Sequence, residues 1–434
     1  MLTAARTPTS PLQQPSLGVR YAGFYFFLVF AVWPLTIPIF PVGSLQSRFP
    51  LLVGVIMIAV AIKEGRKVAQ IRIPAQYFFL FCLFYVLSSI EGPEAPGLIE
   101  GVISLLRSVG LGVALVLSIR TVLDLQFFLR VYVWYGISST VYGLLFMVPG
   151  LTGIGGTLLA MGLPPGKDPG AMRMTGLLTD PTYFGLSVVP ALMIVLHQVI
   201  SSGGAHSKRW HYWLAVFYTA LLSAGILLSF SRTTWAGVAA GILLLTGMQR
   251  KILRTLFSFV FIVLFLHMAA PDELLEIALS DNADRTTIEL NERNDSRSGI
   301  WSAYFDLAMA NPLGYGLGSI EYLRQLPTTF TGMWARENPR PHNMYLFIWV
   351  ESGLQTLLPL LALMGISFLR CWKIRHLVDP STGQPYGSLG MALLTSMTIG
   401  LFGLGGMLQL MAINIALGLS IWYLGVEQKL LRRY

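Results

Sequence analysis

The sequence predicts an all-α polytopic membrane protein with about twelve transmembrane helices. Of its 434 residues, 54% are hydrophobic and only 12% are charged, which is too little charge for the surface of a soluble protein of this size. Apolar runs of about 17–25 residues recur along the chain, and each can cross roughly 30 Å of hydrocarbon. These runs are continuous and do not alternate with polar residues, which predicts helices and excludes a membrane β-barrel.

The predicted spans form one integral membrane domain over residues 1–434. They cover residues 21–42, 49–62, 73–90, 98–119, 125–148, 182–200, 212–229, 234–249, 253–270, 343–369, 386–403 and 407–425. The first apolar run is too long for a signal-peptide core, so we expect an uncleaved first span. Cys82 and Cys371 lie in or beside different spans and form no CxxC pair, so we expect neither a disulfide nor a metal site from them.

Lysine and arginine predict the orientation of the spans. Most of the 30 basic residues fall in short segments on one side of the membrane, such as 63–72 and 370–375. Basic loops mark the cytoplasmic side, so both termini are expected there. The net charge of +9 is then mainly a signal of topology, and the chain is expected to contact membrane lipids and no nucleic acid.

Three segments on the outer side are more than short connectors. Residues 149–181 are rich in glycine and proline, and residues 230–235 (FSRTTW) predict a tight turn. Residues 271–342 form one large loop, which we expect to contain a helix from about 298 to 310. The following Asn-Pro and glycine run would end that helix, and its apolar residues predict that it lies on the bundle surface or in the membrane interface.

Four cationic or titratable residues, far apart in sequence, fall on this outer side. Arg173 precedes the sixth span, Arg232 lies in the turn before the eighth, Arg297 begins the loop helix, and His342 opens the tenth span. Guanidinium groups bind phosphate through two hydrogen bonds and stay charged. A histidine can take a proton from a hydroxyl near neutral pH.

This combination predicts transfer of a sugar from a polyprenyl pyrophosphate to an acceptor hydroxyl. The arginines would stabilise the departing pyrophosphate, and the histidine would act as the base. We expect no metal and no cofactor, because the outer loops contain no acidic or His/Cys cluster typical of a metal site. By pattern alone, His342 could also be a plain helix-start residue, Arg232 an interface anchor, and Arg297 a solvated loop charge.

Other residues are secondary candidates. Arg107 lies about 13 Å along the fourth span, where a charge is costly; we expect either an ion pair with Glu100 or a contact with donor phosphate. Trp301 and Tyr345 fit a sugar-stacking surface or an interfacial belt, and Asn343 adjoins the histidine. Glu351 lies about 180° around the helix from His342, so we interpret it as a packing or hydrogen-bonding residue.

Four motifs in this order, RMTGLLTDPTYFG, SRTTWAG, RSGIW with NPLGYGLG, and PHNMYL with ESG, resemble the O-antigen ligase and Wzy-type polymerase superfamily of membrane glycosyltransferases. The resemblance is good over roughly residues 170–355 and closest to O-antigen ligases. One departure is Thr182, where the pattern usually has asparagine after Asp-Pro; it affects the detail of donor contacts.

The resemblance implies a GT-C-like helical fold in the bacterial inner membrane, with the active site facing the periplasm. It implies an undecaprenyl-pyrophosphate-linked glycan as donor and inverting transfer without metal. It assigns His342 as the catalytic residue and Arg173, Arg232 and Arg297 as donor pyrophosphate-binding residues. The acceptor would be lipid A–core in a ligase of lipopolysaccharide synthesis.

Two alternatives stay open at this stage. A Wzy-type polymerase of O-antigen or exopolysaccharide would use a second lipid-linked glycan as acceptor, with the same donor chemistry. A polytopic transporter or flippase would place ionisable residues along a path through the membrane. We find no internal repeat of the kind that marks many transporters, and of the residues discussed only Arg107 lies deep.

Overall fold

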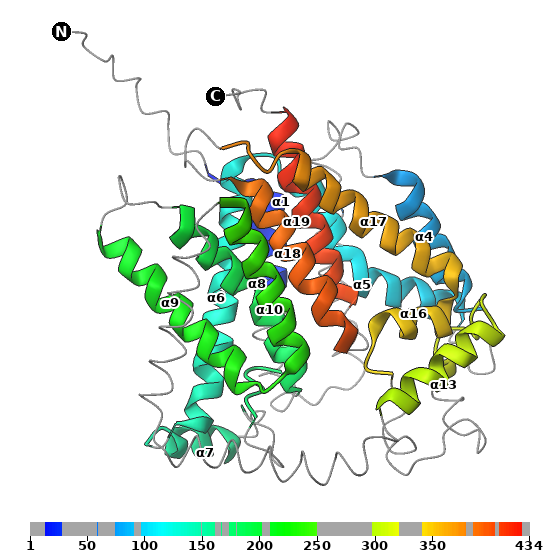
Figure 1. The fold of residues 1–434 in the computed structure, drawn as a ribbon, viewed down its shortest axis with the longest axis horizontal. Helices are drawn as coiled ribbons and strands as arrows, with labels where there is room; N and C mark the ends of the chain where they lie inside the picture. Colours follow the sequence, from blue (N-terminus) through cyan, green and yellow to red (C-terminus); the bar gives the residue numbers. More distant parts are fainter. Residues whose placement is uncertain are drawn as a thin grey trace.

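The computed structural model is a bundle of helices (Figure 1). It describes residues 14–27, 59, 74–90, 97–148, 150–160, 166, 173–178, 180–201, 209–249, 297–320, 341–378, 385–403 and 408–427. Within them the helices are α1 (Leu17–Phe27), α4 (Ala75–Leu87), α5 (Leu98–Ser118), α6 (Val122–Met147), α7 (Thr152–Ala160), α8 (Pro181–Ser201), α9 (Arg209–Leu228), α10 (Arg232–Gln249), α13 (Arg297–Ala310), α16 (Met344–Ser352), α17 (Leu354–Lys373), α18 (Tyr386–Gly400), the 3-10 helix η3 (Leu401–Gly403) and α19 (Leu408–Glu427). No strand occurs in these ranges, which confirms the all-α prediction.

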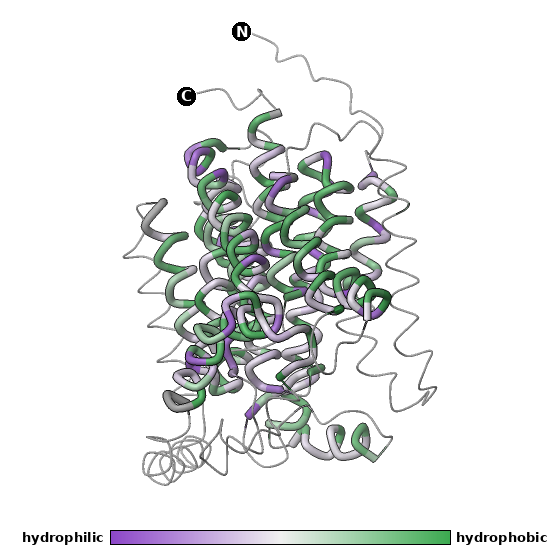
Figure 2. Tube along the Cα trace, turned by 90° about the vertical axis from the view of Figure 1, so that its right-hand side faces the viewer, coloured by the Kyte–Doolittle hydropathy of each residue, from purple (hydrophilic) through white to green (hydrophobic). Residues whose placement is uncertain are grey.

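Five of these helices are long and apolar enough to cross a membrane: Leu98–Ser118, Pro181–Ser201, Leu354–Lys373, Tyr386–Gly403 and Leu408–Val426. A sixth is added if α6 and α7, which meet at an angle of 101°, form one broken span. Hydrophobic residues dominate the long helices (Figure 2). The chain is therefore a multi-pass membrane protein. The expected span 253–270, all of 49–62 except residue 59, and most of 21–42 lie outside the described residues, so the total of twelve stays a prediction.

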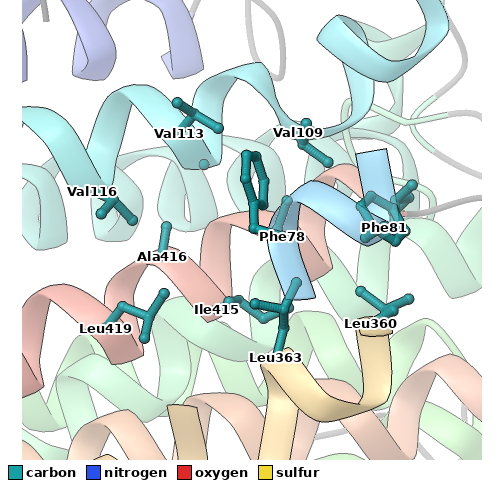
Figure 3. A pocket seen from close by; sticks show the side chains of 13 residues that line it. Phe78, Phe81, Val109, Val113, Val116, Leu360, Leu363, Ile415, Ala416 and Leu419 are labelled. Atoms are coloured by element: carbon teal, nitrogen blue, oxygen red, sulfur yellow. The ribbon is translucent and has the colours of Figure 1, made fainter. Parts of the chain in front are cut away.

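The bundle core is built around α18, which packs against α8, α10, α17 and α19. A second close pair is α5 with α19. Here the helices approach closely because Gly112 has no side chain: a Cβ atom built on it would lie 2.8 Å from the carbonyl oxygen of Ala412. An apolar hollow remains between α4, α5, α17 and α19, with Phe78, Val113 and Leu363 among its lining residues (Figure 3).

A buried carboxylate ties the beginnings of α1 and α6 together. Asp124 is only 1% exposed and forms a capping box with Thr121 at the start of α6. Its other oxygen accepts a hydrogen bond from the backbone N–H of Ser16, at 2.7 Å. Such a cap satisfies backbone donors that the first helical turn leaves unpaired, so one side chain fixes two helix ends.

One predicted feature of the outer segments is wrong in detail. The turn predicted at 230–235 is shorter, because α10 already begins at Arg232. The segment 149–181, which the sequence marks as more than a short connector, contains the helix α7. The loop helix predicted from about 298 to 310 is confirmed as α13.

The predicted continuous span 343–369 is also wrong, because Gly353 divides it into α16 and α17. Gly353 has a φ of +77°, a backbone conformation that glycine adopts easily and other residues rarely do. Its N–H donates to Trp349 at the end of α16, and the N–H of Leu354 donates to the carbonyl of Pro312, at 2.9 Å. The N–H of Leu354 therefore bonds to the loop after α13 and does not continue the hydrogen bonding of α16.

We expect Gly353→Ala to destabilise the protein by about 1–3 kcal/mol. The left-handed φ is strained for alanine, and a Cβ atom would clash with the Leu313 carbonyl and the Gln355 side chain. The matched control is Gly365→Ala inside α17, where a Cβ atom meets nothing within 4 Å and better helix propensity favours alanine. Thermal unfolding midpoints in detergent check this; an unchanged midpoint for Gly353→Ala would contradict it.

Candidate active site

The segment containing Arg173 lies against the end of α9. The backbone N–H of Met174 donates to the carbonyl of Leu228, at 2.8 Å. The guanidinium Nε of Arg173 donates to the carbonyl of Ser229, at 3.1 Å. Arg173 is thereby held at the turn that connects α9 to α10, although 59 residues separate it from Arg232 in the numbering.

Arg232 is the first residue of α10. The preceding Ser231 caps this helix start: its hydroxyl accepts from the N–H of Thr234, at 3.4 Å, and from the Thr234 hydroxyl, at 2.8 Å. The Arg232 side chain is exposed. A cation at a helix N-terminus opposes the helix dipole, so Arg232 does not serve to stabilise α10. Together, the guanidinium and the helix start favour an anion.

The segment around His342 has an unusual backbone. His342 has a φ of +44°, in the left-handed region that non-glycine residues seldom occupy and that is often found at functional sites. It is held from both sides. The indole N–H of Trp301 donates to the carbonyl of Pro341, at 2.8 Å, and the Asn343 side chain caps α16 by accepting from the N–H groups of Tyr345 and Leu346, at 3.0 and 3.2 Å.

Helices α13 and α16 lie side by side and are linked at both ends (Figure 1). Trp301 makes the link at their beginnings. At their far ends, the N–H groups of Tyr315 and Gly316 donate to the carbonyls of Val350 and Glu351, at 2.8 and 2.9 Å. Between them, the rings of Phe305 and Trp349 meet edge to face. The loop helix thus holds the His342 segment in place.

Glu351 takes part in the link at the far end of α16. It is 5% exposed, and its carboxylate accepts a hydrogen bond from the N–H of Gly318, at 3.2 Å. The neighbouring Ser352 accepts from the hydroxyl of Ser88, the residue just after α4, at 3.0 Å. Glu351 is therefore a hydrogen-bonding residue of the scaffold, as the sequence suggested.

The 3-10 helix η3 joins the Arg232 region to the His342 region. The ring of Tyr345, three residues after His342, lies 4.8 Å from that of Phe402, and its hydroxyl donates to the carbonyl of Thr398, at 2.8 Å. On the other side, Gly403 packs directly on the side chain of Thr233, next to Arg232. The 3-10 helix η3 therefore lies between the first turn of α16, which follows His342, and the first turn of α10, which Arg232 begins.

Tyr345 is packed into the helix bundle. Its hydroxyl bonds to α18, a candidate membrane span, and only 9% of the residue is exposed. This burial favours a packing role over a sugar-stacking one.

The structure describes fewer contacts for the other predicted site residues. Arg297 is the first residue of α13, one turn before Trp301, and its side chain lies outside what the structure describes. Trp301 is 38% exposed, so its ring can still meet a ligand while its N–H holds Pro341. Arg107 lies within electrostatic range of Tyr25 in α1. Its two interpretations, an ion pair with Glu100 or a phosphate contact, stay predictions.

Several residues of this region were not found from the sequence. Ser229 and Phe402 contribute through a backbone carbonyl and a ring contact, and neither carries a distinctive sequence pattern. Asp180, in the Asp-Pro motif, accepts from the N–H groups of Thr182 and Tyr183, at 2.7 and 3.0 Å. Thr182, the residue that differs from the family pattern, therefore lies in the first turn of α8, beside the segment that contains Arg173.

The described residues form a multi-pass helical membrane protein in which Arg232 begins α10, Arg297 begins α13 and His342 lies just before α16. Residues 217–361 match the O-antigen ligase family model. Over these residues, which include Arg232, Arg297 and His342, the chain is similar to the O-antigen ligase family. Arg173 lies outside the matched residues. A comparison with curated proteins finds no match.

Proposed function

We propose that the protein is a membrane glycosyltransferase that moves a glycan from undecaprenyl pyrophosphate to an acceptor hydroxyl on the periplasmic face. The proposed reaction is ligation of O-antigen to lipid A–core in lipopolysaccharide synthesis. The observation that supports the proposal is that η3 contacts Tyr345, three residues after His342, and Thr233, next to Arg232, while Arg173 is held at the turn before α10. In the proposal, His342 is the proton acceptor and the two arginines bind phosphate.

In the proposed mechanism, His342 accepts the proton of the acceptor hydroxyl. The hydroxyl oxygen then forms a bond to the anomeric carbon, on the face opposite the pyrophosphate. The bond from this carbon to the pyrophosphate oxygen breaks, and undecaprenyl pyrophosphate leaves with the electron pair. Arginines stabilise the charge that develops on the leaving group, and inversion at the anomeric carbon follows from attack on the opposite face.

Each proposed role has support in the local structure. Arg232 is exposed at a helix start, where it can meet an anion without rearrangement. Arg173 uses Nε to hold the Ser229 carbonyl, which places a guanidinium, a group suited to phosphate oxygens, at the turn before α10. His342 is fixed between Pro341 and the Asn343 cap, and such preorganisation lowers the cost of reaching the reactive geometry.

The test is reconstitution of the purified protein with a lipid-linked glycan, with and without lipid A–core. We expect one glycan block to appear on the core, which identifies a ligase. A ladder of products still attached to polyprenyl lipid would instead identify the Wzy-type polymerase. If neither product forms while the glycan crosses the bilayer, the transferase proposal is wrong and a flippase is indicated.

A further inference from the structure

A second polar site lies near Tyr386, where α6 and α18 begin and α8 ends. A cavity of about 150 Å³ is lined there by Gln126, Leu129, Arg130, Ile194, His197, Gln198, Tyr386 and Leu389. We call it the Arg130 pocket. Its polar lining comes from α6, α8 and α18, and none of the residues of the candidate active site contributes to it.

The walls of the Arg130 pocket are held in place by hydrogen bonds and stacking. The amide of Gln126 donates to the hydroxyl of Tyr386, at 3.1 Å. The imidazole Nε2 of His197 lies 3.1 Å from the carbonyl of Pro385, and because a carbonyl can only accept, Nε2 is the donor. The His197 ring stacks on Tyr386 with 5.9 Å between centroids. His197 is 1% exposed, so this side of the pocket is fixed by packing in the protein interior.

Arg130 supplies the charge of the pocket. It lies eight residues after Val122, about 12 Å along a helix of about 39 Å, and so within the hydrocarbon if α6 spans the membrane. A charge at that depth is costly unless it is paired or reaches the interface. Side chains tilt toward the N-terminus of their helix, which directs the guanidinium toward the membrane surface near Tyr386.

Among the residues that the structure describes, none supplies a counter-charge for Arg130. No carboxylate lines the pocket, and among the described residues we find no hydrogen bond or ion pair to the Arg130 guanidinium. The cavity has room for about five water molecules, and a phosphate group fits in such a space. At the depth where helices end, the anion that a membrane supplies is a lipid phosphate.

We propose that the Arg130 pocket binds the phosphate headgroup of an anionic membrane phospholipid. Arg130 pairs with the phosphate, and the polar wall formed by Gln126, His197 and Tyr386 receives the rest of the headgroup. The leucine and isoleucine side chains of the lining face the less polar glycerol region. This site is separate from the proposed transferase site, and the proposal does not depend on that function.

The test measures the thermal unfolding midpoint of the full-length protein in nanodiscs of phosphatidylcholine with increasing phosphatidylglycerol. A ligand that binds only the folded state raises the midpoint. We expect phosphatidylglycerol to raise the unfolding midpoint of the wild type. For Arg130→Gln, we expect that about tenfold more of this lipid is needed to reach half of that rise. In phosphatidylcholine alone, Arg130→Gln is expected to be as stable as the wild type or more so, because the unpaired charge is gone.

The matched control is Arg375→Gln. Arg375 lies at the same end of the bundle, since its backbone packs on Gly387, next to Tyr386. Its own guanidinium lies 4.1 Å from the Trp372 ring and donates to the Trp372 carbonyl, so its loss should leave the lipid response unchanged. An equal response of Arg130→Gln and the wild type would overturn the proposal. So would an equal rise with inorganic phosphate in phosphatidylcholine nanodiscs, which would indicate a site for free phosphate.

Discussion

Replacement of His342 by alanine or by asparagine is expected to abolish glycan transfer while the protein still folds. Loss of a positioned general base typically costs 10²- to 10⁴-fold in rate. The pair of variants is informative because His342 has a φ of +44°. Alanine is strained in that conformation, whereas asparagine tolerates it well but cannot accept the proton as an imidazole does. The measurement is the initial rate of transfer by purified protein in proteoliposomes.

The two His342 variants separate chemistry from conformation. If both are inactive with unchanged unfolding midpoints, the imidazole itself is needed. Activity of the asparagine variant near the wild-type level would show that the position requires only its backbone conformation, and the base assignment would be wrong. His376→Ala is the matched control, because His376 is exposed at the end of α17, remote in sequence from the site, and should leave transfer unchanged.

Substitution of Arg232 by lysine is expected to lower the transfer rate by about 10²-fold, the typical cost of losing one donor to a developing charge. Lysine keeps the positive charge but loses the planar fork that binds phosphate through two hydrogen bonds. Because the Arg232 side chain is exposed at the start of α10, the unfolding midpoint should change little. Comparison of rates and midpoints with those of Arg375→Lys checks both expectations.

Full activity of Arg232→Lys would contradict bidentate phosphate binding at this position. A parallel loss of stability and activity would instead point to a structural role for Arg232. The helix dipole argues against that second outcome, since a cation at the first position of α10 is, if anything, slightly unfavourable for the helix.

Much of the fold could be predicted because hydrophobic length is a local signal. The bounds of α5, α8 and α19 agree with the predicted spans to within a few residues, and α13 was placed by the Asn-Pro stop and its apolar residues. The break at Gly353 could also have been found, since glycine commonly ends a helix. It was missed because the apolar run continues on both sides of Gly353.

The candidate site was only partly predictable, for a different reason. The residue types of Arg232 and His342 are visible in the motifs, but their relation depends on contacts between distant parts of the chain. Nothing local to Phe402 or Gly403 indicates that η3 fits between Tyr345 and Thr233. Likewise, the hydrogen bond from Arg173 to Ser229 forms between a loop and a helix end. Such contacts arise from packing of the whole bundle.

In the proposed reaction, one site takes the glycan from undecaprenyl pyrophosphate and gives it to an acceptor hydroxyl. The most direct test is to count undecaprenyl pyrophosphate released per glycan transferred by the reconstituted wild-type protein, with lipid A–core present and absent. We predict one molecule released for each glycan joined to the core, and little release without the acceptor. Release at the same rate without any acceptor hydroxyl, or transfer without release, would contradict the account.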